Sequence, residues 1–192
     1  MSRKLMGAGA TVLLGLSLLV PFASAATIDP SPGGLPVLHV QMHFEGRDQV
    51  PDSTQIQKVH YVVGNPNDDT YTLEGTTITD KYGHFALNVA SLRPNKYLLW
   101  VKSSKYLANR VTVDLTEGNV FNADSGLLRA GDANDDNVVN STDLGILKKT
   151  FGKAVGEDNY DDRANFNGDK IVDDTDLAML KDNFGTSGDV AP

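Results

Sequence analysis

The last third of the chain repeats itself, and this duplication constrains the fold more strongly than any other feature. Residues 132–144 align with residues 165–177 at an offset of 33, and the same register continues to the glycines at positions 152 and 185. Each copy begins with an Asp- and Asn-rich loop and continues into a segment whose apolar residues recur at helical spacing. Two copies are too few for an elongated solenoid, so we expect them to pair into one small domain.

Both loops have the oxygen spacing that a hard cation requires. Calcium takes about six to eight oxygens, which an EF-hand-like loop supplies from positions 1, 3, 5, 7 and 9 and a carboxylate at position 12. A solvated acidic turn would explain one such loop, but a second matching copy favours calcium. The predicted ligands are Asp132, Asn134, Asp136, Val138, Asn140 and Asp143 in the first loop (residues 132–143), and Asn165, Asn167, Asp169, Ile171, Asp173 and Asp176 in the second loop (residues 165–176).

The two loops are not equivalent. Position 12 is Asp rather than Glu in both, and the glycine usual at position 6 of an EF-hand is replaced by Asn137 and Lys170. A left-handed backbone at Lys170 would cost about 1 kcal/mol, whereas Asn tolerates it well. Asn165 also removes a formal charge at position 1. We therefore expect Ca²⁺ at two sites, with the second the weaker.

Each loop is predicted to lead into a helix. The apolar residues at position 8, Val139 and Val172, should face each other or the core. Ser and Thr or Asp side chains at positions 10 and 11 are suited to cap the helices, and the acidic position 12 would lie in the first turn, where the helix dipole favours it. The predicted core positions of the two helices are Leu144, Leu147, Phe151, Leu177, Leu180 and Phe184.

The acidity of the chain is concentrated in the repeat. The formal net charge is -8; residues 131–192 hold fourteen acidic and six basic side chains, and the first 130 residues hold eleven of each. This distribution argues against nucleic acid as a partner and favours divalent cations or a basic protein surface. The absence of cysteine excludes disulfides and thiolate sites, so bound calcium is predicted to stabilise the fold in their place.

The N-terminus is typical of an exported protein. Arg3 and Lys4 precede an apolar run over residues 6–20, and Ala23 and Ala25 form a small-residue cleavage site. The run is shorter than the roughly 20 residues of a membrane-spanning helix, which is the alternative. We predict a signal peptide over residues 1–25, no membrane span after its removal, and a secreted, extracellular location. Residues 26–36 are rich in Pro and Gly and are predicted to be a linker.

Residues 37–128 have the alternating pattern of β-strands. Leu38, Val40, Met42 and Phe44 alternate with more polar residues, as a strand with one buried face requires. Further strands are predicted at residues 56–63, 70–79, 85–89, 97–102, 110–115 and 120–128, separated by turn sequences. Short strands with frequent turns and no helical period predict an all-β sandwich of prealbumin or Ig-like type, with antiparallel sheets.

One part of this β region resembles a known module. A threonine-rich strand precedes the hairpin sequence at residues 80–85, in which Asp80, Gly83 and Phe85 match an Asp-x-x-Gly-x-Phe pattern. A strand that begins near Pro94 and contains Tyr97 follows, with asparagine where the pattern usually has glycine. These roughly thirty residues resemble the carboxypeptidase regulatory-like or Cna-B-like modules, which implies a prealbumin-like sandwich.

The duplicated region resembles dockerin domains of type I. The resemblance covers residues 131–185 and includes both acidic loops and both helix signatures. It implies two antiparallel loop-helix units that bind calcium and dock onto a cohesin-like module, usually to recruit polysaccharide-degrading enzymes. A short connection near residues 125–130 fits a dockerin packed on its sandwich as well as one presented freely.

The resemblance also implies a partner-binding face. In type I dockerins the cohesin is recognised by hydroxyl residues at loop positions 10 and 11 and by basic residues later in the helix. The two copies differ at these positions, so binding in two equivalent orientations is in doubt; helix capping and a solvated helix face are the alternative interpretation. The corresponding residues are Ser141, Thr142, Lys148 and Lys149 in the first copy, and Asp174, Thr175 and Lys181 in the second.

The sequence gives little support for catalysis. Glycoside hydrolysis needs a positioned pair of carboxylic acids. Outside the repeat the only glutamates are Glu45, Glu74 and Glu117, scattered over a sandwich of about ninety residues. Trp100 lies on the strand face opposite Tyr97, where it could stack on sugar rings or pack under a loop or against the dockerin. We favour packing and keep the glycan contact as an alternative.

Together these features predict a secreted, noncatalytic two-domain protein. Its β-sandwich would span residues 37–128, its small all-α dockerin residues 129–187, and a tail residues 188–192. The dockerin would bind Ca²⁺ and dock onto a cohesin-like partner in extracellular polysaccharide degradation. The alternatives are a carbohydrate-binding accessory module, which would contact polysaccharide, and a small component associated with glycoside hydrolases.

Overall fold

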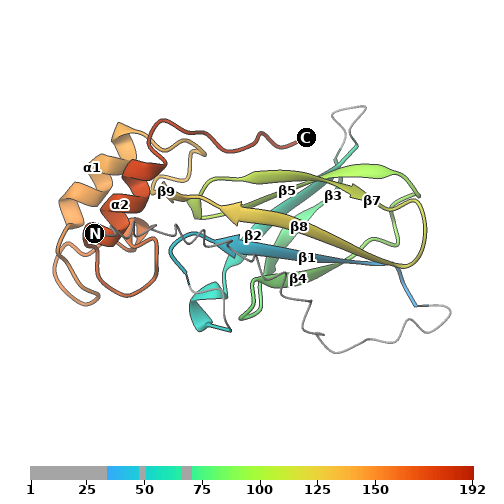
Figure 1. Cartoon of the computed structure of the whole chain (residues 1–192), viewed down its shortest axis with the longest axis horizontal. Helices are drawn as coiled ribbons and strands as arrows, with labels where there is room; N and C mark the ends of the chain where they lie inside the picture. Colours follow the sequence, from blue (N-terminus) through green and yellow to red (C-terminus); the bar gives the residue numbers. More distant parts are fainter. Residues whose placement is uncertain (1–33, 48–50, 66–70) are drawn as a thin grey trace, which may run out of the picture.

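The computed structural model describes residues 34–47, 51–65 and 71–192 as a layered β domain followed by two short helices (Figure 1). The predicted signal peptide and the first part of the linker lie outside the described residues, so both stay predictions. No helix in the described ranges is long and apolar enough to cross a membrane.

Two sheets form the β domain, and their facing sides bury the apolar members of the alternating pattern. One sheet has the strand order β4-β1-β8, and the other has the order β3-β2-β5-β7. In β1, Leu38, Val40, Met42 and Phe44 are all 1% exposed or less. The strands are β1 (Val37–Phe44), β2 (Lys58–Gly64), β3 (Tyr71–Ile78), β4 (His84–Asn88), β5 (Lys96–Ser103), β7 (Asn109–Asp114) and β8 (Val120–Leu128).

The seven predicted strands are all present. The largest difference is at β2, which begins at Lys58 because Ile56 ends the short helix η1 (Ser53–Gln55). Asp52 caps η1 by accepting a hydrogen bond from the Thr54 N–H at 2.6 Å. The more specific resemblance to prealbumin-like modules stays a prediction.

The prediction of purely antiparallel sheets is wrong for one pair. β1 runs parallel to β8, from the pair Val37 and Val120 to the pair Phe44 and Leu128. Alternation of apolar residues shows which face of a strand is buried but carries no information about the direction of its neighbour. Across the open side, the Asn109 side chain of β7 donates to the carbonyls of Ser125 and Leu127 in β8 and so joins the edges of the two sheets.

The repeat forms two loop-helix units at one end of the sandwich (Figure 1). The helices are α1 (Ser141–Thr150) and α2 (Asp174–Asp182), with a short helix η2 (Asp162–Ala164) before the second loop. The helix caps differ from the prediction. Asn140 and Asp173 at loop position 9 are the N-caps, and each forms a capping box with the position-12 aspartate. The residues at positions 10 and 11 instead belong to the first turn and are exposed.

Two of the six predicted core positions in the helices are exposed. Leu147 and Leu180 are fully buried, and Leu144 and Leu177 are partly buried against the same core. Phe151 and Phe184, in contrast, are 43% and 49% exposed. Each lies just past the end of its helix, where helical spacing no longer determines the direction of the side chain.

Sandwich and repeat share one continuous hydrophobic core. A small strand pair, β6 (Lys105–Tyr106) with β9 (Ala130–Asp132), joins them, and neither strand is apparent from the sequence pattern. Phe44 and Tyr106 make an edge-on ring contact with centroids 5.1 Å apart. Buried residues continue from there through Leu128 to Phe166 and Leu180 of the repeat. The repeat is therefore packed on the sandwich rather than presented on a free linker.

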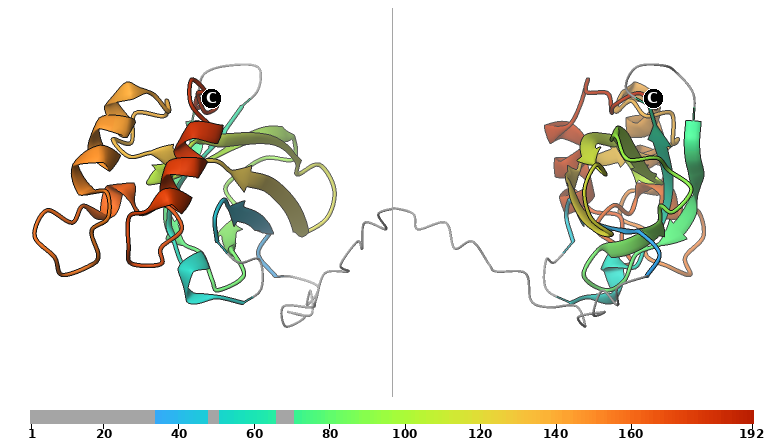
Figure 2. Two further views of the ribbon diagram at one scale, coloured as in Figure 1. Left: turned by 60° about the vertical axis from the view of Figure 1, so that its left-hand side comes forward. Right: turned by 90° about the vertical axis from the view of Figure 1, so that its right-hand side faces the viewer.

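The C-terminal tail returns to the sandwich (Figures 1 and 2). The Asp189 N–H donates to the Ala108 carbonyl at 3.0 Å, and the Asp189 carboxylate accepts from the Arg110 N–H at 2.7 Å. The Gly188 N–H donates to the Asn137 carbonyl at 2.9 Å. Residues 188 and 189 thus connect the first loop to the β7 edge of the sandwich.

Candidate metal centre and docking face

Side-chain oxygens of the first loop turn inward onto the loop's own backbone. Asp132 accepts hydrogen bonds from the N–H groups of Asp136 and Asn137, at 3.0 and 2.9 Å. Asn134 accepts from the Asp136 N–H at 3.1 Å, and Asp136 accepts from the Val138 N–H at 2.9 Å. These short-range bonds hold the loop in a tight turn, with its side-chain oxygens against its own backbone N–H groups.

The second loop repeats this arrangement almost contact for contact. Asn167 accepts from the Asp169 N–H at 3.1 Å, and Asp169 accepts from the Ile171 N–H at 3.0 Å. At position 1 the side-chain oxygen of Asn165 accepts from the Gly168 N–H at 2.8 Å. The amide nitrogen of Asn165 donates to the Tyr160 hydroxyl at 3.0 Å, so its carbonyl oxygen is the one directed into the loop.

The position-12 carboxylates close both loops. Asp143 accepts from the N–H groups of Asn134 and Asn140, at 3.1 and 2.8 Å. Asp176 accepts from Phe166 and Asp173, at 2.7 and 3.0 Å. Both aspartates are fully buried. Each carboxylate therefore links the beginning of its loop to the first turn of its helix.

Two isolated β-bridges, one at each loop, link the two units to each other. Val138 bridges to Ser187, and Ile171 bridges to Ala154, a pair displaced by the same 33 residues. The N–H of Gly185 donates to the Val139 carbonyl at 2.8 Å, as that of Gly152 does to Val172 at 2.7 Å. Val139 and Val172 are fully buried, as predicted for position 8. Each loop is therefore braced by the segment that follows the helix of the other unit.

Position 6 is left-handed in both loops. Asn137 has φ 68° and Lys170 has φ 77°. Asn adopts this region readily, whereas a lysine there costs about 1 kcal/mol. Lys170 therefore has the left-handed backbone for which the sequence predicts strain in the second loop.

Burial makes the loop carboxylates suitable partners for a cation. Burial raises the pKa of Asp176 above its usual value, although backbone hydrogen bonds from Asp173, Phe166 and Asn167 oppose it. Burial likewise raises the pKa of Asp132, against the effect of Lys102. A cation would offset this cost. Carboxylates alone are insufficient, because the described residues contain no cluster of three or more His, Cys, Asp or Glu suited to a metal. The Asn side chains and the position-7 carbonyls have to supply the remaining oxygens.

The sandwich contacts the first loop with a lysine. Lys102 of β5 is 8% exposed, and its ammonium lies 2.9 Å from Oδ2 of Asp132. The same ammonium also contacts the carboxylate of Asp135 at loop position 4. Asn137 accepts a hydrogen bond from the Ala108 N–H at 2.8 Å and donates one to the Asp189 carbonyl at 3.0 Å.

Side chains of the sandwich contact the second loop mainly at backbone carbonyls of the loop. The Tyr106 hydroxyl donates to the Phe166 carbonyl at 2.5 Å and accepts from Nε of Arg47 at 2.6 Å. Burial raises the pKa of Tyr106 to about 12. Lys105 donates to the Asn165 carbonyl at 3.1 Å and pairs at 2.6 Å with Asp162, which precedes the loop.

The predicted partner-binding side chains are exposed on the two helices. Those of the first unit lie on α1, which Figure 1 shows at the end of the molecule away from the sandwich. On α2, Asn183 just past the helix donates to Glu45 at 2.5 Å, so this unit lies against the sandwich. The exposed residues are Ser141, Thr142, Lys148, Lys149, Asp174, Thr175 and Lys181.

The Trp100 side chain is packed inside the protein and is not exposed on its surface. It is 9% exposed, clusters with Val62 and Ala108, and contacts Ala191 of the tail. Its indole N–H donates to the Asp189 carbonyl at 2.8 Å. His60 makes an edge-on contact with the ring at 5.5 Å between centroids. This burial argues against the alternative in which Trp100 stacks on sugar rings.

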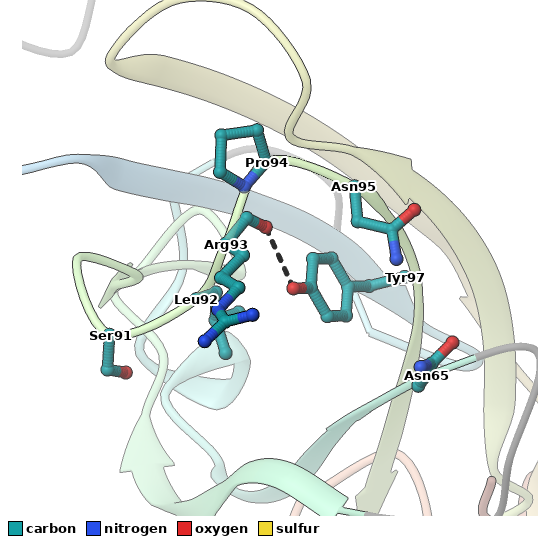
Figure 3. A pocket seen from close by; sticks show the side chains of 7 residues that line it. All are labelled: Asn65, Ser91, Leu92, Arg93, Pro94, Asn95 and Tyr97. Atoms are coloured by element: carbon teal, nitrogen blue, oxygen red, sulfur yellow. Dashed lines mark hydrogen bonds between the residues drawn. The ribbon is translucent and has the colours of Figure 1, made fainter.

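A surface pocket lies beside the loop that joins β4 and β5. Its volume is about 440 Å³, and Tyr97 at its base donates a hydrogen bond to the Arg93 carbonyl at 2.8 Å (Figure 3). Among the residues that the structure describes, no carboxylate lines this pocket. The lining residues are Asn65, Ser91, Leu92, Arg93, Pro94, Asn95 and Tyr97.

Known structures share this fold beyond the repeat. Chains from two interface mutants of a type II cohesin–X-dockerin complex of Acetivibrio cellulolyticus align over 80% of this chain and 97% of their own length. Their identities are 18% and 17%, with TM-scores of 0.59 and 0.60. A type II cohesin–dockerin structure from Bacteroides cellolosolvens is 33% identical over 31% of this chain and 90% of its own, with a TM-score of 0.27. No curated protein matches the sequence.

The family comparison identifies the repeat. The model of the dockerin type I domain matches residues 130–185, which include both acidic loops and both helices. The match begins at the first residue of β9, where the chain leaves the sandwich. Dockerin domains are in general calcium-binding. Residues 130–185 are a dockerin domain, and the chain is a dockerin-domain protein.

Proposed function

We propose that this chain is a secreted, noncatalytic dockerin protein that binds two calcium ions and docks onto a cohesin-like partner. The observation that carries the proposal is the pair of loops with matching inward-turned oxygens, each closed by a buried aspartate that begins a helix. A dockerin domain at residues 130–185 is in accord with this function.

Two features support calcium at both loops. The side-chain oxygens of positions 3 and 5 accept equivalent backbone hydrogen bonds in the two copies, and a buried aspartate closes each loop at position 12. The ligand side chains also include the same number of carboxylates. They are Asp132, Asp136 and Asp143 in the first loop, and Asp169, Asp173 and Asp176 in the second.

The exposed side chains of α1 support docking through the first unit. Ser141, Thr142, Lys148 and Lys149 are exposed together on the helix farther from the sandwich. Phe151 adds an exposed aromatic side chain directly after that helix, and large exposed apolar groups beside polar ones are typical of interfaces. The structures of similar fold come from type II cohesin complexes, whereas the matched family is type I, so both kinds of cohesin are candidate partners.

The sandwich supports a structural role rather than catalysis. Glu45, one of its few glutamates, accepts hydrogen bonds from the Ala130 N–H and the Asn183 side chain, so it is engaged in joining the two parts. The described lining of the pocket beside Arg93 holds no carboxylate, and Ala191 of the tail packs against the cluster that contains Trp100. Polysaccharide degradation is the proposed setting because dockerins usually serve it, and export follows from the predicted signal peptide.

Calorimetry with mature protein and purified type I and type II cohesins, in calcium and in chelator, tests the proposal. We expect binding of one cohesin type in calcium and none in chelator. Lys148→Glu combined with Lys149→Glu should weaken it at least tenfold, whereas Lys96→Glu, on the sandwich, should leave it unchanged. Absence of calcium binding by the purified chain, or equal cohesin binding in chelator, would contradict the proposal.

A further inference from the structure

The contact between Lys102 and Asp132 distinguishes the two loops in a way that their sequences do not. Asp132 is the position-1 residue of the first loop and is fully buried, and the ammonium that touches it belongs to the sandwich. At the equivalent position of the second loop, Asn165 is neutral and bonds through its amide to Tyr160. Lys105 donates to the backbone carbonyl of Asn165 and pairs with Asp162, which precedes the loop and is not one of its ligands.

The contact with Lys102 makes the net charge of the first ligand set differ from that of the second. Each loop has three aspartates among its ligand side chains, because Asp173 at position 9 compensates for Asn165 at position 1. Lys102 adds one positive charge to the first set. Among the described residues, no sandwich cation forms an ion pair with a ligand carboxylate of the second loop. Counting only the ligand side chains and Lys102, the first set carries two net negative charges and the second carries three.

We infer that Lys102 is a built-in counter-cation of the first loop, which lowers the calcium affinity of this loop below that of the second. The inference rests on the proposed calcium function and reverses the order expected from Asn165 and Lys170. Calcium bound at about 2.3–2.6 Å from an Asp132 oxygen would share that carboxylate with the ammonium. Two cations on one buried carboxylate repel each other with little screening by salt.

The same contact makes the first loop less dependent on calcium for its shape. Without calcium, neighbouring carboxylates repel and oppose folding of the loop. Lys102 partly neutralises Asp132 and Asp135, and the tail holds Asn137 on the sandwich. Calcium therefore has less repulsion to relieve in the first loop than in the second. Lys102 acts through Asp132 and is a positioning residue rather than a calcium ligand.

A calcium titration of the full mature chain, followed by NMR, tests the order of filling. The backbone amides of Asn137 and Lys170, at position 6 of each loop, report the two sites separately. In the wild type we expect the Lys170 signal to reach its midpoint at lower calcium than the Asn137 signal. If Asn137 responds first, the inference is overturned without any substitution.

The variant Lys102→Met removes the charge and keeps much of the apolar stem. We expect the Asn137 midpoint to move to about tenfold lower calcium, because the repulsion across Asp132 is lost, while the Lys170 midpoint stays within about twofold. A purely structural role would weaken the first loop, so an unchanged or higher midpoint overturns the inference. If neither loop of the wild type responds to calcium, the calcium proposal itself fails.

Two controls separate charge from packing. Lys96→Met removes the same charge from the same strand at an exposed pair with Asp114, 3.7 Å apart, and should move neither midpoint. Lys102→Arg keeps the charge and should remain closer to the wild type than to Lys102→Met. A shift in Lys102→Arg as large as that in Lys102→Met would show that the shape of lysine, not its charge, matters and would contradict the inference.

Discussion

The two loop-helix units are nearly identical inside and different at their contacts with the sandwich. Both loops use equivalent hydrogen bonds at positions 3, 5 and 12, and each is braced by a strand from the other unit. The first loop meets the sandwich through the side chains of Asp132 and Asn137, whereas the second meets it through the Phe166 and Asn165 carbonyls. A duplicated sequence therefore produces two loops whose contacts with the neighbouring domain differ.

The largest change in stability should come from replacing the position-12 carboxylates, Asp143 and Asp176, one at a time. Calcium at a thousandfold excess over Kd stabilises a protein by about 4 kcal/mol per site, and a tenfold tighter site adds about 1.4 kcal/mol. We therefore expect Asp176→Asn to lose more calcium-dependent stability than Asp143→Asn. Denaturant unfolding in calcium and in chelator measures both losses. A greater loss in Asp143→Asn would show that the first loop is the tighter site.

Tyr106 sharpens the comparison because it joins the sandwich to the second loop only. Its pKa is about 12 when folded, against about 10 when unfolded. Between these values the unfolded state releases a proton that the folded state keeps, so stability falls as pH rises from 10 to 12. We expect this residue to contribute a loss of about 2–3 kcal/mol by pH 12.

Tyr106→Phe should remove that part of the alkaline loss. At neutral pH it should cost about 1–3 kcal/mol, because the Phe166 carbonyl and Arg47 each lose a buried partner. Chemical unfolding between pH 8 and 11.5 measures both effects. Equal alkaline slopes for the variant and the wild type would be inconsistent with a neutral, buried Tyr106 hydroxyl.

Gly188 tests the connection of the tail to the first loop. An added Cβ would lie 2.5 Å from the Ala108 nitrogen and close to the Asn137 amide, so Gly188→Ala must displace the tail. We expect a loss of about 1–2 kcal/mol and a red shift of Trp100 fluorescence as its cover is lifted. Gly145→Ala, on the open face of α1, is the matched control and should stabilise slightly. Unchanged fluorescence in Gly188→Ala would contradict the role of the tail.

The smallest effect on stability is expected at the two phenylalanines beyond the helices. Phe151→Ser and Phe184→Ser should each change the free energy of unfolding by no more than about 1 kcal/mol, because only about half of each residue is buried. Thermal melting measures this directly. A loss of several kcal/mol from either would mean that the ring is a core residue, as its spacing in the sequence suggests.

Local patterns explain why much of the fold follows from the sequence. Strand alternation identified β1 to β5, β7 and β8, because each strand buries one face whatever its neighbours are. Loop spacing likewise predicts the ligand oxygens, because calcium loops are built from residues close together in the chain, and the ligand set stays a prediction. The cap at Asn140 was missed because the position-9 side chain was assigned to calcium alone.

Other features could not be predicted because they join residues far apart in the chain. The parallel pairing of β1 with β8, the choice of the C-terminal tail as the segment that covers Trp100, and the strand pair β6–β9 all depend on where distant segments meet. None of these contacts has a periodic signal, since periodicity describes a segment and not its partner.

The sequence by itself determined that this protein has two acidic loops, each followed by a helix, because the residue types and their spacing lie within each repeat. Tertiary structure decided how the surroundings of the loops differ. It brought Lys102 onto the Asp132 carboxylate across 30 positions of the chain, whereas Lys105 contacts Asn165 at its backbone carbonyl. Charges act through space, so the environment of a ligand is fixed by the residues that folding places beside it.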